Sequence, residues 1–299
     1  MKTVLIGGVI TTRRVLETMI ELNFPISYVF SLDEEKINEV ADYDPVYKTA
    51  EANNIPYKKF TRINDEDNVK IIKELNPDYI FVIGLSQLVK QDIISAAKIG
   101  VVGFHPAPLP KYRGRAANVW QQLLGEKESK SSIFFIDDGI DAGDILAQET
   151  YTIDDNDYAI DVCNKIDDAA VKGMRKVLTQ MMDGTLKPIK QDESKATYTL
   201  KRTPEDGLID WNEPLDKIHL FIRAISKPYP GAYSMYDGKH KFIIYRAEKL
   251  ENNQYIGFNG QIAEINKDYI DVLCKDGLLR ITEYENVDDV KLFVGHRLK

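Results

Sequence analysis

One histidine of this chain stands where a side chain could move a proton. His105 follows the apolar run 101–104 and precedes a loop that contains three prolines, whose rings fix φ and stiffen the backbone. Nearby, Arg113 and Arg115 carry guanidinium groups that can bind an anion through paired hydrogen bonds. Because imidazole titrates near neutral pH, the stretch Gly103–Trp120 is a candidate for acid–base chemistry beside an anion site.

A second stretch, Asp137–Leu146, gathers aspartates around two glycines. Such a turn is either a calcium-binding loop or a solvated surface loop, and the second is the commoner outcome. The spacing of its acids differs from that of an EF-hand calcium loop, so we expect no metal. Composition and spacing alone identify no reaction for either stretch.

The elements that must position these two stretches alternate between strands and helices. We expect early strands at residues 3–6, 26–32, 78–84 and 101–105, with helical patterns between them. This order predicts a parallel sheet covered by helices on both faces, with ligands at the carboxyl ends of the strands. His105 stands at one such end. Further elements are predicted at 131–136 (strand), 145–153 (strand) and 157–182 (helix).

The pattern changes after residue 183. Residues 184–206 are polar and lack periodicity, so we predict a linker there. Residues 207–299 combine a helix with short strands separated by glycine-containing turns. The predicted fold is therefore α/β: a Rossmann-like, parallel-sheet domain over 1–183, followed by a smaller β-rich, OB-like C-terminal domain over 207–299.

Charge and composition narrow the classes of function. The chain has 39 basic and 47 acidic residues, a net charge of −8, which opposes non-specific binding to nucleic acid. The two cysteines, Cys163 and Cys274, lie far apart, outside any metal spacing. The N-terminus lacks the pattern of a signal peptide, and no apolar run reaches the roughly 18 residues of a membrane span. We expect a soluble, cytoplasmic protein with neither a nucleic-acid nor a membrane partner.

Taken together, the two stretches resemble the formyltetrahydrofolate-dependent formyltransferases. His-Pro-x-x-Leu-Pro-x-x-Arg-Gly, beginning at His105, and Asp-x-Gly-x-Asp-x-Gly-Asp, beginning at Asp137, match the two signature regions of that family. Arg-Ala-x-x-x-Pro-Tyr-Pro-Gly-Ala at Arg223–Ala232 is similar to the start of the second domain in methionyl-tRNA formyltransferase and in nucleotide-sugar N-formyltransferases. The resemblance covers most of the chain.

The resemblance implies roles for particular residues. His105 would take or shuttle the proton that the attacking amine loses, and Asp141 would orient His105 and stabilise developing charge. The co-substrate would be N10-formyltetrahydrofolate, with its pteridine against backbone groups of two loops and no metal. The matching positions for the pteridine are Leu85, Ser86, Gln87, Leu88, Val89, Asp137, Asp138, Gly139 and Ile140.

One position departs from the family pattern. The family has an asparagine two residues before the catalytic histidine, where its amide polarises the formyl oxygen, and this chain has Gly103. Losing one such donor costs about 10²–10³ in rate. Asn118, Gln87 or an ordered water in the space left by Gly103 could replace it. Otherwise the chain belongs to a branch with altered geometry, or is a weak or inactive relative.

The acceptor amine is expected on a nucleotide-linked amino-deoxysugar. The stretch Gly114–Trp120 is more similar to the sugar-modifying branch, and the nearly neutral C-terminal third offers little to tRNA phosphates. The predicted substrate-binding residues are Thr11, Arg13, Arg14, Arg113 and Arg115. Alternatives are a methionyl-tRNA formyltransferase, a formyltetrahydrofolate hydrolase and a non-catalytic folate- or sugar-binding relative. The sequence leaves open whether the chain forms a homodimer. NAD is rejected because G-x-G-x-x-G is absent.

Overall fold

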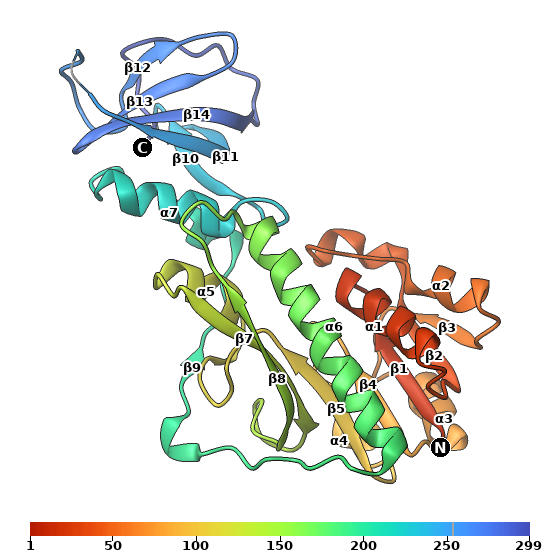
Figure 1. Cartoon of the computed structure of the whole chain (residues 1–299). Coiled ribbons are helices and arrows are strands. Elements are labelled where there is room, and N and C mark those ends of the chain that lie inside the picture. The colour runs from red at the N-terminus through yellow and green to blue at the C-terminus, as the bar shows by residue number, and fades with distance from the viewer. Residues whose placement is uncertain (253) are drawn as a thin grey trace. The chain divides into compact units, whose positions relative to one another are not determined.

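The computed structural model describes residues 1–252 and 254–299, which form two compact units (Figure 1). The first unit consists of Met1–Asn118, Glu128–Thr152 and Cys163–Leu200. The second consists of Val119–Lys127, Ile153–Val162 and Lys201–Lys299. In the part of the chain that is described, no helix is both long and apolar enough to cross a membrane.

A seven-stranded sheet forms the centre of the first unit, in the order β3-β2-β1-β4-β5-β7-β8. Its strands are β1 (Thr3–Gly7), β2 (Tyr28–Leu32), β3 (Tyr57–Phe60), β4 (Tyr79–Val82), β5 (Gly100–His105), β7 (Glu128–Ile136) and β8 (Ile145–Thr152). The first five run parallel, as predicted. Strand β7 is antiparallel to both of its neighbours, β5 and β8. The short loop that joins β7 to β8 cannot make the crossover that a parallel pair needs.

Helices cover both faces of this sheet, which confirms the predicted α/β class. The helices that precede the second sheet in the chain, apart from α7, are α1 (Ile10–Glu21), α2 (Val46–Ala52), α3 (Glu66–Leu75), α4 (Gln91–Ile94), α5 (Ala117–Leu123) and α6 (Ala159–Asp183). The 3-10 turn η1 (Glu34–Glu39) lies between β2 and α2. Leu16 of α1 and Met174 of α6 are buried in one apolar cluster. Ile72 of α3 and Ile93 of α4 are buried in another.

The order of strands reverses between β1 and β4, where open α/β sheets have a crevice. In this protein the start of α1 packs directly against the end of β4 at this point. The Thr12 hydroxyl donates to the Ile83 carbonyl at 2.7 Å, and a Cβ on Gly7 would lie 2.2 Å from that same carbonyl oxygen.

The predicted linker, 184–206, is largely part of the first unit. Residues up to Leu200 pack with that unit, and β9 (Tyr198–Thr199) pairs in parallel with β6 (Arg113–Gly114). This segment also contains the 3-10 turn η2 (Glu193–Lys195), and η3 (Pro204–Gly207) follows it in the second unit. The prediction missed this order because the segment is held by polar and backbone bonds, which leave no hydrophobic periodicity.

The second unit packs α7 (Leu215–Ile225) against a five-stranded antiparallel sheet in the order β10-β11-β14-β13-β12. Its strands are β10 (Ala232–Tyr236), β11 (His240–Leu250), β12 (Ile262–Ile265), β13 (Ile270–Cys274) and β14 (Gly277–Asn286). The chain end bridges the two edges, because Lys299 pairs with Met235 and Leu298 donates to Gly260. The predicted β-rich domain is confirmed, and its sheet closes in a barrel-like manner.

Candidate active site

His105 is the last residue of β5, and the residue is 6% exposed. Nε2 lies 2.7 Å from the Tyr112 carbonyl oxygen. Because a carbonyl only accepts hydrogen bonds, this contact assigns a proton to Nε2. Nδ1 faces the Asp141 carboxylate, 3.6 Å from Oδ2. In the neutral ring, Nδ1 is therefore the basic nitrogen, and any proton it accepts is placed beside a negative charge.

Both groups that face the His105 ring come from residues with a left-handed backbone. Tyr112 has a φ of 60° and Asp141 a φ of 49°, values that non-glycine residues seldom adopt. Asp141 Oδ2 accepts the Gly114 N–H at 2.8 Å, which ties the two loops together. Such conformations persist only where surrounding contacts hold them, and they gather at functional sites.

Arg113 is buried rather than open to a substrate, which corrects the prediction that it binds an anionic ligand. Its side chain is 1% exposed, and its guanidinium donates to both carboxylate oxygens of Glu193, at 2.6 and 2.8 Å. It also donates to the Gln191 amide oxygen at 2.8 Å. The ion pair lowers the pKa of Glu193. The sequence did not reveal this role because both partners lie far along the chain.

Residues 189–199, inside the predicted linker, run past both loops of the site. Ile189 exchanges two backbone hydrogen bonds of 2.8 Å with Ile145, at the start of β8. Further along, Thr197 accepts the Tyr112 N–H on its hydroxyl at 2.8 Å, and the Arg115 N–H donates to the Thr199 carbonyl at 3.1 Å. The alternation of Thr197 and Thr199 is typical of a strand and is the signal that could have located this segment.

Gln87 fixes the 85–89 loop through both ends of its side-chain amide. Its Oε1 accepts the Ile63 N–H at 2.9 Å, and its Nε2 donates to the Thr61 carbonyl at 2.7 Å. Asn64 adds a second tie by donating to the Leu88 carbonyl at 2.8 Å. Both ends of the Gln87 amide thus contact the neighbouring backbone, and Nε2 carries a second N–H besides the one donated to Thr61.

The two loops predicted to bind the pteridine expose polar backbone and aliphatic side chains. Within residues 1–252 and 254–299, the N–H groups of residues 85–89 have no hydrogen-bond acceptor. Leu88 is 86% exposed and Ile140 is 63% exposed. In the second loop, the Gly139 N–H donates to the Asp137 carboxylate at 2.9 Å, and Asp138 is exposed.

The space beside Gly103 is occupied by apolar side chains. A Cβ at this position would lie 2.8 Å from Cγ1 of Ile136 and 3.1 Å from a ring carbon of Phe134. An ordered water in the space left by the glycine is therefore excluded. Asn118, the remaining candidate donor, lies on α5 with its Nδ2 4.0 Å from the Cys163 sulfur.

The other predicted substrate-binding residues divide into two groups. Thr11 donates its hydroxyl to Asp167, Arg13 contacts Asp44 and Glu17, and Arg14 contacts Asp168. These three side chains thus already have partners within the first unit. Arg115, by contrast, is exposed, and no acidic partner is described for its side chain in the residues that the structure covers.

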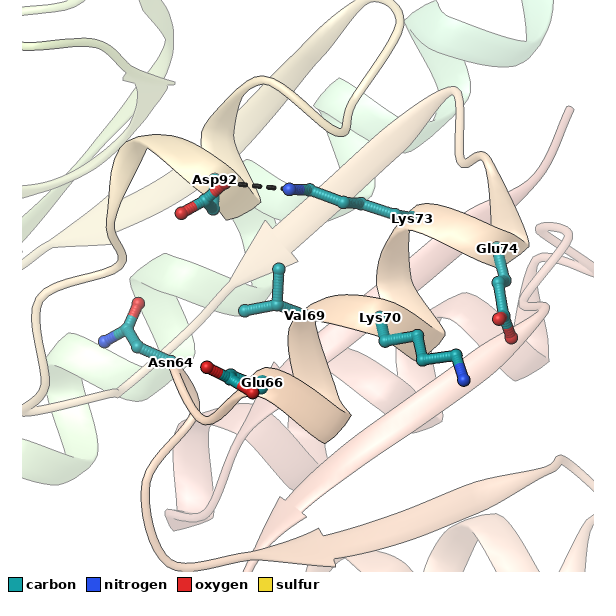
Figure 2. A pocket seen from close by; sticks show the side chains of 7 residues that line it. All are labelled: Asn64, Glu66, Val69, Lys70, Lys73, Glu74 and Asp92. Atoms are coloured by element: carbon teal, nitrogen blue, oxygen red, sulfur yellow. Dashed lines mark hydrogen bonds and ion pairs between the residues drawn. The ribbon is translucent and has the colours of Figure 1, made fainter.

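The pocket drawn in Figure 2 is lined by none of the predicted site residues. It is an open depression of about 570 Å³, lined by Asn64, Glu66, Val69, Lys70, Lys73, Glu74 and Asp92. The ion pair between Lys73 and Asp92, 2.8 Å long, joins α3 to α4 across it. Its charges are mixed, so the pocket lacks the few convergent polar groups that a ligand site needs. The described residues contain no cluster of three or more side chains that could hold a metal ion.

The carboxyl group of Asp42, near the start of α1, makes stability depend on pH. Burial and, to a lesser extent, the charge of Asp167 raise the pKa of Asp42 to about 6. The folded protein thus retains this proton above the pH at which the unfolded chain, whose aspartates have an ordinary pKa of 3.8, releases it. Stability should therefore fall as pH rises from about 4 to 6, and the penalty should persist above pH 6.

Replacing Asp42 by asparagine removes that penalty. We expect D42N to be more stable than the wild type at pH 8 by about 1–2 kcal/mol, since Asp42 is only half-buried, and nearly equal to it at pH 4. Urea unfolding at several pH values measures the difference. An equal change at every pH would contradict the assignment.

Comparison with known proteins gives two domain matches. Residues 15–178 match the family described as formyl transferase, and residues 201–290 match the family described as formyl transferase, C-terminal domain. The first match alone covers more than half of the chain.

Solved structures share the fold at low sequence identity. HypX from Aquifex aeolicus, in complex with tetrahydrofolic acid, is 18% identical over 95% of this chain, with a TM-score of 0.72, and this chain spans only 44% of it. The N-formyltransferase from Helicobacter canadensis, in complex with folinic acid and dTDP-3-aminofucose, is 20% identical over 95% of this chain and all of its own, with a TM-score of 0.66. Methionyl-tRNA formyltransferase from Clostridium thermocellum is 21% identical, with a TM-score of 0.63. The match covers 93% of this chain and all of that protein.

Proposed function

We propose that this chain, which belongs to the formyl transferase family, transfers a formyl group from N10-formyltetrahydrofolate to the amino group of a nucleotide-linked amino sugar. One observation carries the proposal: the His105 ring is held between the Tyr112 carbonyl and the Asp141 carboxylate at the carboxyl end of β5. This arrangement gives a buried base with one defined basic nitrogen. Transfer to an amine requires such a base because the attacking nitrogen must lose a proton.

The exposed loops support folate as the co-substrate. A pteridine is a flat ring with an amide-like edge, so it needs backbone hydrogen-bond groups at its edge and apolar side chains on its faces. The free N–H groups of residues 85–89 and the exposed Leu88 and Ile140 meet both needs. Tetrahydrofolic acid and folinic acid in the related structures are consistent with this proposal.

The residues suggest an order of bond changes. The amine nitrogen bonds to the formyl carbon, and the formyl oxygen gains negative charge. Nδ1 of His105 accepts the proton that the amine loses, and Asp141 stabilises the resulting imidazolium. The bond from the formyl carbon to N10 then breaks, and the proton passes to N10, so that tetrahydrofolate leaves and the amine carries the formyl group.

The donor to the formyl oxygen is proposed to be Asn118, because Gln87 is held against the backbone of residues 61–63 and apolar side chains fill the space beside Gly103. An amide donor of this kind contributes about 10²–10³ to the rate. An unchanged kcat in Asn118→Ala would remove Asn118 from this role.

A nucleotide sugar is favoured as the acceptor over methionyl-tRNA. The net charge of −8 gives little attraction to tRNA phosphates, whereas the exposed Arg115 can pair with a diphosphate. The dTDP-sugar complex of the Helicobacter canadensis relative agrees with this choice. The alternatives of methionyl-tRNA or water as acceptor are outcomes of the same experiment.

The test supplies N10-formyltetrahydrofolate with dTDP- and UDP-linked amino sugars, with methionyl-tRNA, or with no acceptor. Formylated nucleotide sugar is the expected product by mass spectrometry. Formylated methionyl-tRNA alone would overturn the sugar proposal, formate alone would indicate a hydrolase, and no product would indicate a non-catalytic relative.

Replacing Arg115 by alanine should raise the KM for the nucleotide sugar by about tenfold or more while kcat changes by less than about threefold, because the lost contacts bind the diphosphate and not the reacting atoms. Arg175→Ala on α6, which loses an exposed ion pair to Glu21, is the matched control. Equal KM values in both variants would contradict a role for Arg115.

A further inference from the structure

Two side chains of the segment 189–199 bind the backbone of the two residues whose groups face the His105 ring, Asp141 and Tyr112. We propose that Gln191 and Thr197 are positioning residues, with Gln191 fixing Asp141 and Thr197 fixing Tyr112. The inference rests on the proposed function, since it concerns the reactivity of His105. Neither residue touches the ring itself, so both act through the groups that do.

Gln191 is 5% exposed, and its amide uses both of its ends. Nε2 donates to the Asp141 carbonyl at 2.8 Å and to the Gly143 carbonyl at 2.7 Å. Oε1 accepts from Arg113 Nη2 at 2.8 Å and from Nε at 3.2 Å. The partners determine which end of the amide is nitrogen, because carbonyls only accept and a guanidinium only donates. Gln191 thus joins the Asp141 loop to the loop that follows His105.

Thr197 binds Tyr112, the residue whose carbonyl contacts Nε2 of the ring. Its hydroxyl accepts the Tyr112 N–H at 2.8 Å, and its carbonyl accepts the Arg113 N–H at 2.9 Å. The Thr199 hydroxyl adds a bond of 3.1 Å to the Arg113 carbonyl. Tyr112 supplies the carbonyl that accepts from Nε2 of His105, so these bonds fix which nitrogen keeps the proton.

Backbone conformation explains why these contacts position the groups and do not only add stability. Tyr112 and Asp141 both have positive φ angles, which cost energy for residues with a Cβ, more for tyrosine than for aspartate. When its tie is lost, such a residue tends to return to negative φ, and that rotation turns its carbonyl or carboxylate away from the ring. The loops can then remain folded while the groups around His105 are out of place.

Gln191→Glu separates positioning from stability. Glutamate keeps an oxygen for Arg113 but presents its other oxygen to the carbonyls of Asp141 and Gly143, which it repels. We expect kcat to fall by about tenfold or more, with the KM for folate changed by less than about threefold. Gln122→Glu is the matched control, because Gln122 is 2% exposed and donates to the Asp157 carbonyl at 2.8 Å within the second unit. Its Tm should fall at least as far as that of Gln191→Glu, with kcat retained.

A second readout does not require activity. The chain has four histidines, so ¹⁵N-histidine NMR can assign the His105 ring by comparison with His105→Ala. The neutral ring should carry its proton on Nε2 in the wild type and in Thr197→Ser, and lose this preference in Thr197→Val. A wild-type proton position in Thr197→Val, or a wild-type kcat in Gln191→Glu, would overturn the corresponding assignment. If no acceptor is formylated, the proposed function fails, and the NMR result still decides the positioning role of Thr197.

Discussion

Replacing His105 by alanine should lower kcat for formyl transfer by about 10²–10⁴, the usual contribution of a general base. The loss is expected because Nδ1 is the one ring nitrogen left basic by the Tyr112 carbonyl, and it faces Asp141. Folate affinity should change little, since the proposed folate contacts lie in the 85–89 loop and in residues 137–140. Single-turnover transfer and equilibrium titration with tetrahydrofolate measure the two effects.

His219→Ala is the matched control for that experiment. His219 also places Nε2 against a backbone carbonyl, that of Ala247, at 3.0 Å, within the second unit. Burial lowers its pKa to about 4, so it stays neutral at the assay pH. Its replacement should affect Tm but not kcat. A His105→Ala variant that retains wild-type kcat would show that the ring is not the base.

Local patterns predicted the fold and the position of His105. Buried strands such as β1 and β4 are continuous apolar runs, and the helices between them repeat every three to four residues, so both are visible in a short window of sequence. The carboxyl ends of parallel strands share one edge of the sheet, and ligands bind at that edge. The sequence alone therefore predicts a site at His105. The two domain matches confirm the family that the motifs indicated.

Contacts between distant segments could not be predicted. Arg113 was expected to face a ligand because a sequence shows a charge but not its partner, and Glu193 and Gln191 follow it only much later. The polar residues 189–199 were assigned to a linker for the same reason. Their bonds use backbone groups and short polar side chains, which leave no hydrophobic pattern. Gln87 was named as one of three candidate donors to the formyl oxygen, and the sequence did not show its two backbone partners at 61–63.

Replacing Asp141 by asparagine should lower kcat by about 10²–10³, because it removes the charge that stabilises the imidazolium form of His105. The change is nearly isosteric. Asparagine adopts the left-handed backbone that Asp141 needs at a φ of 49°, and its side-chain oxygen can still accept the Gly114 N–H. The free energy of unfolding should therefore change by less than about 1 kcal/mol, and folate affinity should be retained.

Asp237→Asn supplies a control with the same local geometry. Asp237 has a φ of 50°, and its carboxylate lies 2.6 Å from Nδ1 of His296 in the second unit, so this variant also removes a charge from an aspartate–histidine pair. It should leave kcat unchanged. Asp141→Ala should lose the same activity as Asp141→Asn and about 1 kcal/mol of additional stability, because alanine disfavours positive φ. If Asp141→Asn retained wild-type kcat while Asp141→Ala did not, the loop geometry and not the carboxylate charge would be the source of the effect.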